Sequence, residues 1–158
     1  MPGLKRLLVV CTGNSCRSVI AKGLFKKRLG NREEIRVYSA GIAAMPGFRP
    51  TQETIEVMSS HGIDVSTHLT QRLTDNMIQD ADLILVMEVM HKREILKRVS
   101  SAKKKVYLLR EYADATSEDS NEDSKEIDVP DPIAKPIEVY ESCFQMIQES
   151  VEKIVQKL

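Results

Sequence analysis

Several residue types and patterns are scarce in this chain of 158 residues. It has three cysteines, no tryptophan and only 4% aromatic residues. Because the number of cysteines is odd, and Cys11 and Cys16 lie close together, a disulfide framework is excluded and we expect a reducing, cytoplasmic location. No apolar run approaches the ~20 residues of a membrane-spanning helix, and residues 1–6 lead into only a short apolar run. We therefore expect neither a membrane span nor a signal peptide.

The chain also lacks an excess of charge of either sign. Its 23 basic residues balance its 23 acidic residues, so no overall field attracts nucleic acid or an anionic membrane surface. The histidines and cysteines do not have the spacing of metal ligands, and we expect no metal and no cofactor. With 42% hydrophobic residues, the chain can bury one substantial core, which predicts a single domain over residues 1–158.

Apolar runs typical of buried strands alternate with segments of helical periodicity. We expect strands over residues 5–10, 35–39, 83–87 and 105–109, and helices over 17–29, 51–61, 74–79, 89–99 and from Pro136 to the end. Cys143 lies beside the apolar stripe of the last helix and is interpreted as a core residue. This alternation predicts an α/β protein with a parallel sheet and helices on both faces.

The segment 113–128 differs in composition from the rest of the chain. It holds seven acidic residues, one lysine and a single large apolar residue, Ile127. Such a composition does not support a core position, so we expect a solvated, flexible acidic loop.

The most informative motif is Cys11-Thr-Gly-Asn-Ser-Cys-Arg17-Ser18, which directly follows an apolar run. A loop of this length can close around a tetrahedral oxyanion, with backbone N–H groups and the start of a helix directed at it. Arg17 can bind two oxygens at once, and Ser18 can donate a hydrogen bond to a thiolate at Cys11. The motif therefore predicts phosphoryl transfer through a covalent cysteine. The alternative is a structural cysteine at the end of a strand.

With this motif, the chain resembles the low-molecular-weight protein tyrosine phosphatase family, which includes bacterial protein arginine phosphatases and thioredoxin-coupled arsenate reductases. Further segments that are typical of the family follow in the family's order: 38–41, 62–68, 73–74, 81–87 with His91 after it, and 129–132. Val19 departs from the family, which usually has proline or glutamine there. The resemblance implies a flavodoxin-like three-layer sandwich around a four-stranded parallel sheet. It also implies that the phosphate is bound by Thr12, Gly13, Asn14, Ser15, Cys16, Arg17 and Ser18.

Asp131 is the candidate general acid, because the leaving group must receive a proton. Its neighbours Pro130 and Pro132 stiffen the segment, and the family has an Asp-Pro loop at this place. The alternative is that Asp131 is the N-cap of a helix.

Two further residues are assigned a supporting role by the resemblance. Ser39 and His68 correspond to a serine and a histidine that hold the loop asparagine, here Asn14, in a strained conformation. A histidine in such a turn can otherwise be a surface or capping residue, and His61 and His91 are interpreted as helix-end residues. Cys16 is interpreted either as a partner for reversible oxidation of Cys11 or as a packing residue.

Substrate preference depends on few residues. Ser15, Phe48 and Ile133 are the candidate lining of the substrate pocket. We expect a phosphorylated protein as substrate, with phosphotyrosine as the first choice. Phosphoarginine is the alternative, because a hydroxyl residue at the position of Ser15 is typical of arginine phosphatases. Arsenate reduction is disfavoured because residues 83–98 hold no relay cysteines, and a phosphate-binding module without catalysis is disfavoured because Cys11, Arg17 and Asp131 are all present. We expect inorganic phosphate or vanadate as ligands, and a monomer or weak dimer.

Overall fold

The fold is centred on a four-stranded parallel sheet with the strand order β2-β1-β3-β4. The computed structural model describes residues 3–114 and 127–158. The strands are β1 (Arg6–Cys11), β2 (Arg36–Gly41), β3 (Leu83–Val86) and β4 (Val106–Leu108). β1 pairs with β2 on one side and with β3 on the other, so it is the central strand that carries the cysteine motif at its end.

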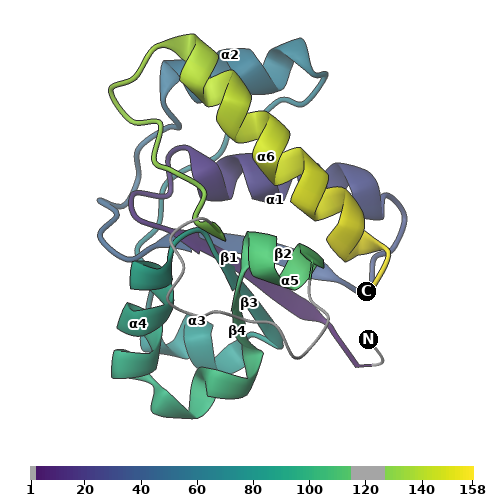
Figure 1. Cartoon of the computed structure of the whole chain (residues 1–158), viewed down its shortest axis with the longest axis vertical. Coiled ribbons are helices and arrows are strands. Elements are labelled where there is room, and N and C mark those ends of the chain that lie inside the picture. Colours follow the sequence, from purple (N-terminus) through teal and green to yellow (C-terminus); the bar gives the residue numbers. More distant parts are fainter. Residues whose placement is uncertain (1–2, 115–126) are drawn as a thin grey trace.

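Helices cover both faces of the sheet (Figure 1). On one face lie α1 (Arg17–Leu29), α5 (Leu109–Asp114) and the long closing helix α6 (Ile137–Val155), with α2 (Gln52–Ser60) packed outside α1 and α6. On the other face lie α3 (Asp75–Asp80) and α4 (Val89–Arg98), followed by the 3-10 turn η1 (Ser100–Lys105). The predicted α/β class, with helices on both faces of a four-stranded parallel sheet, is confirmed.

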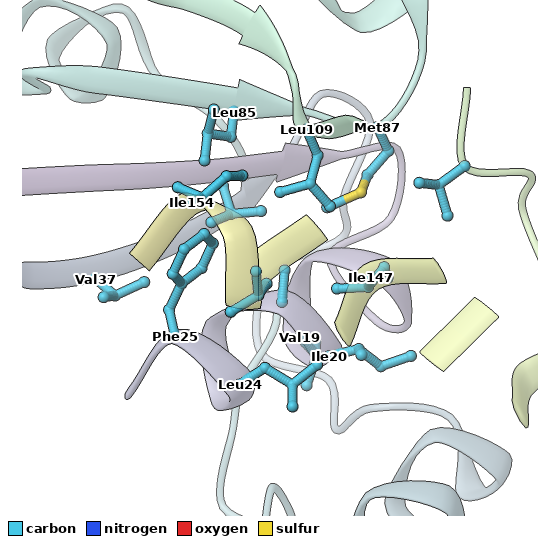
Figure 2. Close-up of a cluster of buried hydrophobic side chains, with 14 of the residues drawn as sticks. Val19, Ile20, Leu24, Phe25, Val37, Leu85, Met87, Leu109, Ile147 and Ile154 are labelled. Atoms are coloured by element: carbon cyan, nitrogen blue, oxygen red, sulfur yellow. The ribbon is translucent and has the colours of Figure 1, made fainter. Parts of the chain in front are cut away.

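The core is divided by the sheet, because side chains alternate along β1. Leu7 and Val9 pack toward α1 and α6, whereas Leu8 and Val10 pack toward α3 and α4. Figure 2 shows the first of these clusters, in which Phe25 of α1, Ile154 of α6 and Leu85 of β3 meet. A strand that is buried on both faces has little freedom to shift, so its end is a rigid place for a functional residue.

The predicted strands and helices are present, with boundaries that differ by at most three residues, but two short elements were missed. The central residues of the predicted strand 105–109 form β4, whereas Leu109 is the first residue of α5. The turn η1 was also not predicted, since its serines and lysines have no apolar periodicity. Within the described residues, no helix is both long and apolar enough to cross a bilayer.

The expectation for segment 113–128 was wrong at both of its ends. Ala113 is buried in the last turn of α5, and Ile127 packs against the core under α3 and α4. Asp128 accepts a hydrogen bond from the N–H of Val89, at 2.9 Å, at the start of α4. Residues 115–126, to which the rest of that expectation refers, lie outside the described residues.

Candidate active site

The end of β1 brings Cys11 to the carboxyl edge of the sheet. In open parallel sheets, ligands bind at the carboxyl ends of two adjacent strands whose following connections run to opposite sides of the sheet. β1 and β3 are such a pair, because the chain continues from β1 to β2 on one side and from β3 to β4 on the other. Beyond the strand, the carbonyls of Cys11 and Thr12 accept hydrogen bonds from the N–H groups of Ile42 and Ala43, at 2.9 and 3.0 Å. The beginning of the motif is thus attached to the chain that follows β2.

Asn14 has the strained backbone in this loop. Its φ is 55°, in the left-handed region, and its side chain is fully buried. The amide Nδ2 donates to Ser18 Oγ at 2.8 Å and to Ser39 Oγ at 3.0 Å. The amide Oδ1 accepts from the backbone N–H of Gln71 at 2.9 Å. A non-glycine residue in this region persists only when its surroundings fix it, and these bonds do so from three separate segments.

His68 adds a further contact to Asn14. Its Nε2 lies 3.1 Å from the carbonyl oxygen of Asn14 and 3.2 Å from Oδ1. Both of these oxygens are acceptors, so Nε2 carries the proton and donates. Burial lowers the pKa of His68, the hydrogen bond to Asn14 raises it, and the charges of Lys22 and Lys26 lower it, for a net decrease.

Gly41 allows β2 to approach the loop closely. A Cβ at this position would lie 2.5 Å from the carbonyl oxygen of Thr12 and 2.8 Å from the backbone nitrogen of Asn14. Both atoms belong to backbone, which cannot move aside as a flexible side chain can. The absence of a side chain at Gly41 is therefore required by the position of the loop.

Arg17, the first residue of α1, is only 1% exposed. Its Nη1 donates to the carbonyl of Val129 at 2.7 Å and forms an ion pair with Glu88 at 2.9 Å. Its Nη2 lies 3.5 Å from Asp131 Oδ2 and 3.4 Å from Thr12 Oγ1. Burial by itself lowers the pKa of Arg17, but the charges of Cys11, Glu88 and Asp131 outweigh it and raise the pKa. The guanidinium is thus a permanent buried cation beside Cys11.

Cys11 is buried, and its Sγ lies 2.9 Å from Ser18 Oγ. Because Ser18 Oγ accepts a hydrogen bond from Asn14 Nδ2, its own proton is available to the sulfur. A hydroxyl donor and a guanidinium near one sulfur both stabilise a thiolate.

Asp131 lies in a segment that is tied to the end of β3. The N–H of Val129 donates to the carbonyl of Met87 at 2.8 Å. Asp131 Oδ1 accepts from the N–H of Ile133 at 3.1 Å, and its side chain is 38% exposed. The N-cap of α6 is Pro136, so the alternative interpretation of Asp131 as a helix N-cap was wrong.

A largely buried polar network around Glu88 and His91 was not predicted from the sequence. His91 Nδ1 accepts from the N–H of Glu88 at 3.0 Å, so its Nε2 carries the proton and donates to Thr12 Oγ1 at 2.9 Å. Burial, with the charge of Arg17, lowers the pKa of His91 to about 3. His91 does lie in the first turn of α4, as its interpretation as a helix-end residue required, but it also contacts the loop. No spacing rule points to these contacts, because 79 positions separate Thr12 and His91.

The candidate lining residues of the substrate pocket are more open to solvent. Ser15 is half-buried, and its carbonyl accepts from the N–H of Thr51 at 3.1 Å. The side chains of Phe48 and Ile133 are 59% and 48% exposed. They are accessible to a large ligand.

The other cysteines and His61 lie away from solvent or at a helix end. All three cysteines are free thiols. Cys16 is buried, and its sulfur lies 3.6 Å from Thr51 Oγ1. Cys143 is buried in the core, as expected, and burial raises the pKa of its thiol to about 12. His61 caps the end of α2 and stacks on the ring of Phe144.

Among residues 3–114 and 127–158, no group of three acidic, histidine or cysteine side chains could hold a metal ion. The site is built instead from a buried cysteine, a buried arginine and a nearby carboxylate around one strand–loop–helix unit. This arrangement defines the class of proteins that transfer phosphoryl groups through cysteine.

The comparison with known proteins agrees with this class. The sequence model of the family described as low molecular weight phosphotyrosine protein phosphatase matches residues 6–158, and the chain therefore belongs to this family. The resemblance noted in the sequence is thereby confirmed.

Individual relatives cover nearly the whole chain. A probable low molecular weight protein-tyrosine-phosphatase EpsP of Ralstonia nicotianae is 36% identical over 155 residues, which is 98% of this chain and 97% of that protein. A protein-arginine-phosphatase of Bacillus subtilis is 30% identical over 154 residues, 96% of this chain and 95% of that protein. The crystal structure of a low molecular weight protein tyrosine phosphatase from T. tengcongensis has a TM-score of 0.85 at 32% identity, covering 97% of this chain and 99% of that one.

Proposed function

We propose that this protein hydrolyses phosphotyrosine in proteins through a phosphocysteine intermediate, with Cys11 as nucleophile, Arg17 as phosphate ligand and Asp131 as general acid. One observation carries the proposal. The buried guanidinium of Arg17 lies beside both Cys11 and Asp131, so one bound phosphate can contact the nucleophile, the cation and the acid together. Residues 12–16 supply the backbone N–H groups for the remaining phosphate oxygens.

In the first step, the Cys11 thiolate attacks phosphorus and an S–P bond forms. The P–O bond to the phenol breaks, and its electron pair leaves with the phenol oxygen, which takes a proton from the Asp131 carboxyl. Arg17 binds two equatorial oxygens and stabilises the charge that they share in the transition state. A bound phosphate competes with Asp131 for Nη2 of Arg17 and so frees the carboxyl for the leaving group.

In the second step, the Asp131 carboxylate takes a proton from water while the water oxygen attacks phosphorus. The S–P bond breaks, and its electron pair returns to Cys11 as the thiolate, with release of inorganic phosphate. Ser18 supports this step because its hydroxyl, 2.9 Å from the sulfur, hydrogen-bonds the leaving thiolate. No metal or organic cofactor is needed for either step.

An aryl phosphate is the proposed substrate because Phe48 and Ile133 offer exposed apolar surface for an aromatic ring. The phosphoarginine alternative rests on Ser15, whose small hydroxyl side chain leaves space and a hydrogen-bond partner for a guanidinium. It is also favoured by the Bacillus subtilis relative, which is named as a protein-arginine-phosphatase.

The deciding experiment compares two peptides of one sequence, one with phosphotyrosine and one with phosphoarginine, using the purified protein. We expect kcat/KM for phosphotyrosine to be higher by about tenfold or more. A higher value for phosphoarginine would reverse the substrate assignment. Release of phosphate from neither peptide would contradict the proposed activity itself.

A further inference from the structure

A hollow lies beside α1, next to the segment that supports the phosphate-binding loop. Its volume is about 290 Å³, and it runs between α1 and residues 64–71. Its lining is mixed, with the exposed apolar side chain of Leu69, the buried Val19 and Val65 beneath, and cationic or basic groups from Lys22, Lys26 and His68. None of the loop residues 12–18 lines it. It therefore has the composition of a small-molecule site rather than of a continuation of the cysteine site.

The lysines of this hollow are not neutralised by the protein. Within the described residues, the side-chain ammonium groups of Lys22 and Lys26 form no hydrogen bond or ion pair. Burial and the charge of Lys26 lower the pKa of Lys22. The lining holds one carboxylate, Asp64, and its Oδ1 accepts from the N–H of Ser66 at 2.9 Å. Two cations one helical turn apart repel each other, so an anion between them would be stabilised.

His68 connects the hollow to the loop. Its Nε2 donates to Asn14, and for its other ring nitrogen, Nδ1, the described residues provide no hydrogen-bond partner. Protonation would add an N–H at Nδ1 without breaking the bonds to Asn14, and it would make those bonds charge-assisted. An anion near His68 therefore affects both the hollow and the strained residue of the loop.

We propose that this hollow is a binding site for a small organic anion, whose carboxylate or phosphate group contacts Lys22, Lys26 and His68 and whose apolar part packs on the exposed side chain of Leu69. Binding of the anion favours protonated His68 and strengthens its hold on Asn14. The charged groups that face His68 are Lys22 and Lys26 from α1 and Asp64 from its own segment. By linkage, the anion binds more tightly as the pH falls through the pKa of His68.

The test is a titration of the full chain, followed by NMR, with benzoate as the carboxylate probe and phenylphosphonate as the phosphate-like probe. Resonances of Gly23, Val65 and Leu69 report on the hollow, and those of Gly13 and Ser15 report on the loop, so the two sites are separated in one spectrum. We expect saturable shifts in the hollow with a Kd in the range of about 0.1–10 mM. We also expect the pKa of His68 to rise by about one unit at saturation and the Asn14 side-chain amide to shift with it.

The variant K22Q/K26Q should weaken binding in the hollow by about tenfold or more. The matched control is K103Q/K104Q, which removes the same charge from two exposed lysines of η1 and should leave the Kd unchanged. Tighter binding of one probe identifies the anionic group that the site prefers. The proposal is overturned if neither probe shifts the hollow, or if K22Q/K26Q binds as tightly as the control. Because binding is measured without turnover, this outcome is independent of the proposed phosphatase activity.

Discussion

At the scale of single residues, the site depends on a buried arginine with several acceptors. Val129, Glu88 and Asp131 each take a hydrogen bond or ion pair from the guanidinium of Arg17. A planar group with five donors can satisfy these acceptors and still face an oxyanion, which an ammonium group cannot do. Full burial of a charge is tolerated here because carboxylates and a carbonyl compensate it.

The variant C11S should lose turnover by a factor of about 10⁴ or more, because a serine hydroxyl is a far weaker nucleophile than a thiolate. Binding of phosphate or vanadate should remain measurable by calorimetry, since the anion is held by backbone N–H groups and Arg17. Substantial phosphate release by this variant would contradict the covalent mechanism.

The variant D131N should lower kcat by a factor of about 10²–10⁴, because the leaving group no longer receives a proton. The loss should be smaller for aryl phosphates whose phenol is a good leaving group. The measurement is kcat for a series of aryl phosphates whose phenol leaving groups decrease in acidity. An equal loss for all of them would show that Asp131 positions the substrate and does not transfer a proton.

Ser15 allows a test of specificity. The variant S15I places an apolar side chain next to the leaving group and should shift the ratio of phosphotyrosine to phosphoarginine turnover upward by about tenfold, because an apolar wall leaves a guanidinium unpaired. The ratio is measured on matched peptides, with S15T as the control that keeps the hydroxyl. An unchanged ratio in S15I would remove Ser15 from the determinants of specificity.

At the scale of elements, the close contact between β2 and the loop gives a further prediction. The variant G41A places a Cβ against the backbone of Thr12 and Asn14 and should cost about 1–3 kcal/mol of stability as well as most of the activity. The control is G30A, where the added Cβ meets nothing within 4 Å but the backbone has φ of 54°. It should lower the melting temperature without changing kcat. Equal kcat values for the two variants would contradict this account of Gly41.

The order of most strands and helices could be predicted from the sequence, because apolar periodicity and the glycines at helix ends and in turns are local signals. The motif from Cys11 to Ser18 is also local, and Asp131 was marked by its flanking prolines. Glu88 and Gln71 could not be found in this way. Their contacts with Arg17 and Asn14 depend on which strands are neighbours and on side-chain orientation, neither of which is encoded in spacing along the chain. The short helix α5 was missed because it begins at Leu109, directly after β4, so that its first residue was assigned to the predicted strand.

At the scale of the whole molecule, His91 predicts how stability depends on pH. In the folded state its pKa is about 3, below the 6.5 of an ordinary histidine, so the unfolded chain binds the proton more readily. This contribution to stability is complete above pH 6.5 and is lost as the pH falls toward 3. At pH 5 the loss amounts to about 2 kcal/mol, and His68 adds to it in the same direction.

The measurement is the free energy of unfolding in urea between about pH 5 and 7.5, a range that lies mostly above the titration of ordinary carboxylates. The variant H91Q should flatten the decrease on the acidic side, because glutamine does not titrate. If wild type and H91Q lose stability in parallel, the acid sensitivity arises elsewhere.

The supports of the loop come from distant parts of the chain, and this has a consequence for refolding. Asn14 is held by Ser39, 25 positions away, and by His68, 54 positions away, while Arg17 is held by Val129, 112 positions away. Contacts over such separations form only after long chain segments have been closed, whereas helices form locally and quickly. After dilution from denaturant, the recovery of circular dichroism should therefore precede the recovery of enzymatic turnover. In this protein, regained activity marks the completion of tertiary structure.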